Sequence, residues 1–167
     1  SKVLSFSYCY HGSVDETFAV RAADGTTIAR PGGVGAPVDV ALTSRSAEFN
    51  DLESVEAALK HGDVAVCITE PALTNIGIVL PQPGFLSGLR DLCTRYGVLL
   101  LIDETHTISA GPGGATRSMG LDPDIFVIGK SIGGGIPTGA YGITQDLADR
   151  ISAHADADLI DVGGVGG

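Results

Sequence analysis

Asp103 and Lys130 are the two residues whose type and position most clearly suggest chemistry. Asp103 follows the apolar run 98–102 (Val-Leu-Leu-Leu-Ile), and Lys130 comes soon after a second run at 125–128 (Ile-Phe-Val-Ile). A lysine at the end of a buried strand is costly to desolvate unless it is paired, neutral or covalently bonded. Lysine amines in such places can act as nucleophiles and form Schiff bases with carbonyl groups.

The carboxylate of Asp103 makes a specific cofactor chemistry conceivable. An acid at the end of an equally apolar strand can keep a pyridine nitrogen protonated, as the electron sink pyridoxal phosphate requires. Each residue also has an ordinary structural interpretation. Lys130 could simply reach solvent from a strand end, and Asp103 could end a strand or cap a helix.

The two apolar runs predict the elements that position these residues. Continuous apolar runs of this length favour strands that are buried on both faces of a parallel sheet covered by helices. Ligands bind beyond the carboxyl ends of such strands. We therefore expect Asp103 and Lys130 at the same edge of one sheet.

The rest of the chain supports an α/β fold with a mostly parallel sheet between helices, because strand and helix patterns alternate. Helical periodicity and end signals predict helices at 51–60, capped by Asn50 or Asp51, and from Pro83 to Gly97. A third helix is expected at 145–151. Further strands are expected at 3–6, 17–22, 63–69 and 140–143, with loops at 31–37 and 111–114.

Composition narrows the class of protein. The 167 residues are 44% apolar, which is typical of one well-packed domain. Ten Lys and Arg against twenty Asp and Glu give a net charge of -10, which disfavours nucleic acid as a partner. No apolar run reaches membrane-spanning length. An odd number of cysteines, three, favours reduced thiols and a cytoplasmic location.

Five motifs occur in one order along the chain. They lie at 9–12 (Cys-Tyr-His-Gly), 70–77 (Glu-Pro, then Asn-Ile-Gly), 83–86 (Pro-Gly-Phe-Leu), 101–104 (Leu-Ile-Asp-Glu) and 129–137 (Gly-Lys-Ser-Ile-Gly-Gly-Gly-Ile-Pro). Together they resemble the class III aminotransferases that depend on pyridoxal 5'-phosphate (PLP), and most of all the glutamate-1-semialdehyde aminomutase branch. The resemblance extends from about residue 2 to residue 151. It implies the large domain of fold type I, a three-layer αβα structure with a seven-stranded, mostly parallel sheet, in a homodimer.

The resemblance also implies roles for individual residues. Lys130 would be the catalytic residue that forms the Schiff base with PLP and carries protons. Asp103 would pair with the pyridine nitrogen. Tyr10 would stack on the cofactor ring with His11 beside it, although His11 could equally belong to an ordinary turn.

Four more positions are expected near the cofactor. Glu70 matches a family Glu-Pro at a strand end, and Asn75 falls where many relatives have a substrate-facing glutamate. Both also have structural or solvent-facing alternatives. Thr105 replaces a valine that packs on the ring. His106 stands where a glutamine often meets the cofactor's phenolic oxygen, a role that an imidazole can fill.

The resemblance covers only part of the family pattern. By it, residues 1–167 would be part of the PLP-binding large domain, and the upstream loop that binds the cofactor phosphate and the small domain would lie outside this chain. The glycine-rich end at 161–167 also suggests a piece of a longer polypeptide. No histidine or cysteine spacing indicates a metal site.

The sequence thus predicts an aminotransferase that moves an amino group between a small-molecule amino donor and a keto or aldehyde acceptor. Two alternatives stay open. One is a glutamate-1-semialdehyde 2,1-aminomutase, an isomerase that keeps the amino group and the carbonyl on one substrate. The other is an isolated fragment with no activity of its own.

Overall fold

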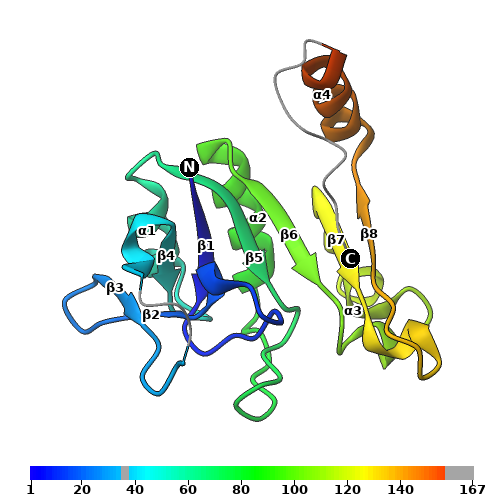
Figure 1. Cartoon of the computed structure of the whole chain (residues 1–167), viewed down its shortest axis with the longest axis horizontal. Helices are drawn as coiled ribbons and strands as arrows, with labels where there is room; N and C mark the ends of the chain where they lie inside the picture. Colours follow the sequence, from blue (N-terminus) through cyan, green and yellow to red (C-terminus); the bar gives the residue numbers. More distant parts are fainter. Residues whose placement is uncertain (35–37, 157–167) are drawn as a thin grey trace.

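A mostly parallel sheet forms the centre of the protein (Figure 1). The computed structural model describes residues 1–34 and 38–156. Within them the sheet has six strands in the order β4-β1-β5-β6-β7-β8. All neighbouring pairs are parallel except β7 and β8, which are antiparallel. The strands are β1 (Lys2–Phe6), β4 (Ser44–Ala47), β5 (Val64–Thr69), β6 (Leu99–Asp103), β7 (Ile125–Ile128) and β8 (Ala140–Ile143). The predicted α/β fold class is confirmed.

Two helices, α1 (Leu52–Leu59) and α2 (Phe85–Tyr96), pack against each other beside the sheet. A separate hairpin joins β2 (Ala19–Arg21) to β3 (Thr27–Ala29). The remaining helices are α3 (Gly114–Ser118) and α4 (Gln145–Asp156). Single 3-10 turns are η1 (Asp15–Thr17), η2 (Val40–Leu42), η3 (Ile108–Ala110) and η4 (Lys130–Gly133).

Local sequence signals explain where the two packed helices begin and end. The side chain of Asp51 accepts the backbone N–H groups of Glu53 and Ser54, so Asp51 is the N-cap of α1. Gly97 ends α2 with a φ of 66°, a left-handed conformation that favours glycine. Helix α2 begins at Phe85, so the prediction that Pro83 occupies its first turn is wrong. Gly84, with a φ of 85°, turns the chain between them.

The hydrophobic core lies between α1, α2 and the strands β1, β5 and β6. Phe6, Phe49 and Phe85 meet edge to face there, with ring centroids 4.8 to 5.8 Å apart. Helix α2 contributes the predicted apolar face, of which Phe85, Leu86, Leu89, Leu92 and Cys93 are buried. This core fixes β5 and β6, whose carboxyl ends carry the candidate site.

Several elements differ from the prediction. The extended segment expected at 17–22 is a 3-10 turn followed by the shorter β2, and α4 continues to Asp156. Strands β3 and β4 and helix α3 were not predicted. Part of the loop expected at 31–37 and the glycine-rich end at 161–167 lie outside the described residues.

The burial expected for the second apolar run is also wrong. All four residues of β7 are half-buried, and Lys130 is exposed. The core residues come from β1, β4, β5, β6, α1, α2 and nearby loops, and within the described ranges β7 contributes none. The apolar run therefore identified a strand correctly but not how completely this chain covers it.

The three cysteines, Cys9, Cys67 and Cys93, are buried and free of disulfide bonds, as the odd count predicted. Within the part of the chain that the structure describes, no helix is both long and apolar enough to cross a bilayer.

Candidate active site

A cavity of about 300 Å³ opens where the parallel strands end. Its lining comes from four segments that each follow or end a strand: 10–12 after β1, Glu70 after β5, Asp103 with Thr105 and His106 at the end of β6, and Val127 with Lys130 at β7. The prediction that Asp103 and Lys130 lie at one edge of the sheet is confirmed. A larger cavity, of about 400 Å³, lies beside α2 and shares no lining residue with this one.

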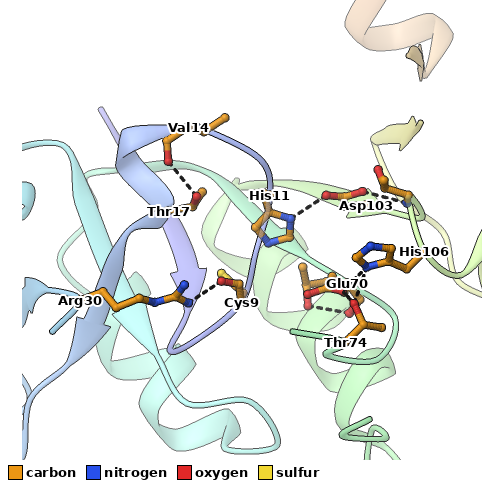
Figure 2. Close-up of polar contacts among 11 residues, drawn as sticks. Cys9, His11, Val14, Thr17, Arg30, Glu70, Thr74, Asp103 and His106 are labelled. Atoms are coloured by element: carbon orange, nitrogen blue, oxygen red, sulfur yellow. Dashed lines mark hydrogen bonds and ion pairs between the residues drawn. The ribbon is translucent and has the colours of Figure 1, made fainter. Parts of the chain in front are cut away.

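Asp103 is held by two hydrogen bonds, one to each carboxylate oxygen. The ring Nδ1 of His11 lies 2.7 Å from Oδ2, and the backbone N–H of Thr105 donates to Oδ1 over 2.9 Å. Figure 2 shows His11 reaching across from the segment after β1 to the end of β6. The side chains of His11 and Asp103 are only 1% and 9% exposed. These contacts fix the direction of the carboxylate before any ligand is present.

The same contacts decide the charge of the pair. Burial disfavours the imidazolium form of His11, but the hydrogen bond to Asp103, with a contribution from the neighbouring Cys9 side chain, raises the pKa of His11 to about 9. Burial likewise disfavours ionised Asp103, yet its hydrogen bonds from His11 and Thr105 bring the pKa of Asp103 below its usual value. Near neutral pH the pair is therefore imidazolium and carboxylate.

Lys130 begins the turn η4 directly after Gly129 and lines the cavity. Its backbone φ is 47°, in the left-handed region that non-glycine residues rarely adopt. Such a conformation costs on the order of 1 kcal/mol and is concentrated at functional sites. The side chain is exposed, so the amine is accessible to a ligand in the cavity.

Glu104 points away from the cavity and anchors the loop that follows Asp103. It is fully buried and accepts the Thr107 hydroxyl over 2.6 Å, the backbone N–H of Ala115 over 3.0 Å, and that of Thr116. These last two donors belong to the first turn of α3. The two adjacent acids therefore have different roles. Asp103 lines the cavity, and Glu104 anchors the loop that follows Asp103.

Glu70, Thr74 and His106 form a second polar group at the cavity edge (Figure 2). The Thr74 hydroxyl donates to Oε2 of Glu70 over 2.6 Å and lies 2.5 Å from Nδ1 of His106. Thr74 was not predicted as a site residue, because no local pattern links it to a histidine 32 residues away. The pairing of His11 with Asp103 was missed for the same reason.

Seven of the eight predicted site residues line the cavity: Tyr10, His11, Glu70, Asp103, Thr105, His106 and Lys130. Asn75 does not. It lies exposed on the turn between Leu73 and Val79, whose backbones pair with each other. The cavity contacts of Gly12 and Val127 were not predicted.

The donor set fits a flat, heteroaromatic carbonyl compound. It combines an accessible amine at Lys130, an ionised acid at Asp103 and a partly exposed aromatic ring at Tyr10. The buried Oε1 of Glu70 has no hydrogen-bond partner among the described residues, so the site has unused polar capacity. These residues therefore fit PLP.

Comparison with known proteins decides the family. The family model for class III aminotransferases matches residues 1–157. The chain belongs to the class III aminotransferase family. Glutamate-1-semialdehyde 2,1-aminomutase from Roseiflexus castenholzii is 44% identical over 155 residues, which are 90% of this chain and 36% of that protein.

Solved structures of class III relatives show the same fold. A glutamate-1-semialdehyde aminomutase from Pseudomonas aeruginosa, in complex with PMP, is 48% identical with a TM-score of 0.91, over 99% of this chain and 38% of that one. An omega-transaminase from Sphaerobacter thermophilus is 30% identical with a TM-score of 0.79, over 88% and 35%. The fold is that of the fold type I PLP-dependent transferases. The chain spans a little over a third of the length of these relatives.

Proposed function

We propose that the protein uses PLP to move an amino group between an amino donor and a keto or aldehyde acceptor. The observation that carries the proposal is the convergence of Lys130, Asp103 and Tyr10 on one cavity, in a chain of the class III family. Bound PLP would supply an electron sink for the bond changes at the substrate's amino carbon.

Lys130 would hold the cofactor and move protons. Its amine is the nucleophile of the cavity and would bond to the cofactor carbonyl. Because the side chain is exposed and its backbone lies on a turn, the amine can reach the cofactor from the sheet edge. The free Lys130 amine would also be placed to take a proton from one carbon of the substrate and return it to another.

Asp103 would keep the pyridine nitrogen protonated. Its carboxylate is ionised near neutral pH and retains unused lone pairs, since each oxygen accepts one hydrogen bond and can accept two. His11 supports this role of Asp103, because the positive charge of its ring stabilises the ionised carboxylate. His11 is thus a positioning residue for Asp103.

The remaining lining residues would surround the ring. Tyr10 offers an aromatic face for stacking, and Thr105 and Val127 offer short side chains. His106 and Glu70 supply the polar side of the cavity, where a phenolic oxygen would find a partner. Contact of Asn75 with the substrate remains a prediction for the assembled enzyme.

Covalent labelling tests the proposal. The full protein is incubated with PLP, reduced with borohydride and mapped by mass spectrometry, and we expect the label on Lys130. Lys130→Ala should abolish both the label and amino transfer. Lys60→Ala is the matched control, because Lys60 is an exposed lysine outside the cavity. Labelling at another lysine, or none at all, would disprove the assignment.

A glutamate-1-semialdehyde 2,1-aminomutase is the second candidate. Relatives from Roseiflexus castenholzii and Nitratidesulfovibrio vulgaris, each 44% identical to this chain, bear that name. Supplying glutamate-1-semialdehyde without an amino acceptor separates the two candidates. Conversion to 5-aminolevulinate supports the mutase, whereas amino transfer that requires a second substrate supports the transferase.

The proposal also covers the cellular location and the oligomeric state of the protein. We place it in the cytoplasm, because its three cysteines are free, and as a homodimer, as the family resemblance implies. The isolated polypeptide 1–167 is expected to bind PLP weakly or not at all, because it spans only about a third of the length of its relatives. Comparing its absorption spectrum with that of the full protein, each mixed with PLP, tests that expectation.

A further inference from the structure

A continuous series of hydrogen bonds joins a buried acid of the cavity, Glu70, to a more exposed imidazole, His106, through Thr74 (Figure 2). Oε2 of Glu70 accepts the hydroxyl of Thr74 over 2.6 Å, and the same hydroxyl oxygen lies 2.5 Å from Nδ1 of His106. Nδ1 of His106 lies 3.8 Å from Oε2 of Glu70, so the threonine bridges the two ionisable groups. In Figure 2 the second ring nitrogen of His106 points away from Thr74.

The number of protons determines which group donates in each of these hydrogen bonds. A threonine hydroxyl has one proton, so it can donate to only one neighbour. The Thr74 hydroxyl donates that proton to Oε2 of Glu70. The Thr74 oxygen must then accept from His106, which places a proton on Nδ1 and leaves Nε2 as the ring nitrogen available to a ligand.

The two ends of this series of hydrogen bonds differ in how deeply they are buried. The side chain of Glu70 is 4% exposed and that of His106 is 37% exposed. The buried carboxylate has one hydrogen bond, since its Oε1 has no partner among the described residues. A buried carboxylate with so few partners is stabilised when a neighbouring group can supply a further proton donor.

We infer that Glu70, Thr74 and His106 form a proton relay that fixes the tautomer of His106 and lets Nε2 exchange a proton with a group bound in the cavity. When Nε2 takes up a proton from water or a bound phenol or ammonium group, the Nδ1 proton can pass to Thr74 while Thr74 passes its own to Glu70. The products are a neutral imidazole protonated at Nε2 and a neutral Glu70. Thr74 is a positioning residue for His106. The inference rests on the proposed function, because the group that exchanges a proton with Nε2 would be the bound cofactor or substrate.

The tautomer of His106 can be measured without turnover. We would record two-bond proton–nitrogen correlation spectra of the full protein labelled with 15N-histidine, near neutral pH and without PLP. The His106→Gln variant identifies the His106 signals. We expect Nδ1 of His106 to carry a proton and Nε2 to be bare.

Two variants interrupt the relay in different ways. Thr74→Val keeps the shape but removes the hydroxyl, and should shift the ratio of the Nδ1–H to the Nε2–H tautomer roughly tenfold towards Nε2–H. In Glu70→Gln the side-chain amide can donate to Thr74, so Thr74 can donate to Nδ1 of His106. This variant should also shift the tautomer ratio towards Nε2–H. Thr74→Ser should retain the wild-type tautomer.

A matched control removes a hydroxyl next to His106 that the relay does not use. The Ser109 hydroxyl donates to the backbone carbonyl of His106 and not to its ring, so Ser109→Ala should leave the tautomer unchanged. An unprotonated Nδ1 in the wild type, or an unchanged tautomer in both Thr74→Val and Glu70→Gln, would overturn the relay. Borohydride labelling of Lys130 in these variants reports separately on the proposed function, which can stand if the relay fails.

Discussion

Replacing Asp103 with asparagine should lower the pKa of His11 by more than two pH units. In the wild type the hydrogen bond to Asp103 outweighs burial and raises the pKa of His11 from 6.5 to about 9. Asparagine keeps the shape of the side chain but removes its charge. Burial then dominates, because the His11 side chain is only 1% exposed, and the pKa should fall to 6.5 or below.

The net effect of burial and of the contacts to Asp103 and Cys9 on the pKa of His11 can be expressed as a free energy. Moving a histidine pKa from 6.5 to about 9 corresponds to roughly 3 kcal/mol, at about 1.4 kcal/mol for each pH unit. Both partners are buried, so little of this coupling is lost to solvent screening. It should therefore appear in the pH dependence of folding as well as in a titration.

Nuclear magnetic resonance of the protein without PLP measures the titration directly. The ring signals of His11, identified by their absence in His11→Gln, are followed from about pH 5 to about pH 10, a range that brackets both pKa values. A wild-type His11 that titrates near 6.5, or one that titrates equally in Asp103→Asn, would refute the argument that these two groups share a buried charge pair.

The remaining predictions concern stability and support of the site. Because the folded-state pKa of His11 is raised, its stabilisation is complete below 6.5 and is lost as pH rises through about 9. The free energy of unfolding, from urea titrations, should therefore fall between those limits by roughly 3 kcal/mol more in the wild type than in His11→Gln. Lys130→Gly should be more stable than Lys130→Ala by about 1 kcal/mol, since only glycine adopts a φ of 47° without strain; equal melting temperatures would contradict this. Glu104→Gln should lose about 2 kcal/mol because it removes a buried charged acceptor. The exposed Glu53→Gln should change stability by less than about 0.5 kcal/mol, and similar losses in both variants would exclude a special role for Glu104.

Elements whose stability is local were predictable from the sequence. Helix α2 shows its buried face at the helical period and ends at Gly97, and the apolar runs before Asp103 and Lys130 identify β6 and β7. The common edge of Asp103 and Lys130 followed from a general rule about parallel sheets. The rule requires only that the two strands are parallel, so it could be applied without knowledge of side-chain contacts.

Elements that depend on distant partners were not predictable. Strand β4 reads Ser-Arg-Ser-Ala and is a strand because it pairs with β1 at the sheet edge. Helix α3 has five residues, and the buried carboxylate of Glu104 accepts the first N–H groups of that helix. Within the site, His11 and Asp103 are 92 residues apart, so no local pattern could pair them. The half-burial of β7 likewise depends on what covers it.

The pairing of the two cavity acids bears on the role proposed for Lys130. Asp103 is paired with His11 over 2.7 Å, and Glu70 is linked to His106 through Thr74. Among the described residues Lys130 has no ion-pair partner. An amine must lose its proton before it can attack a carbonyl, and a salt bridge would oppose that loss by favouring the charged form. Asp103 pairs with an imidazole directly and Glu70 does so through Thr74, so neither acid forms an ion pair with Lys130, and the Asp103→Asn and Thr74→Val variants perturb these two contacts one at a time.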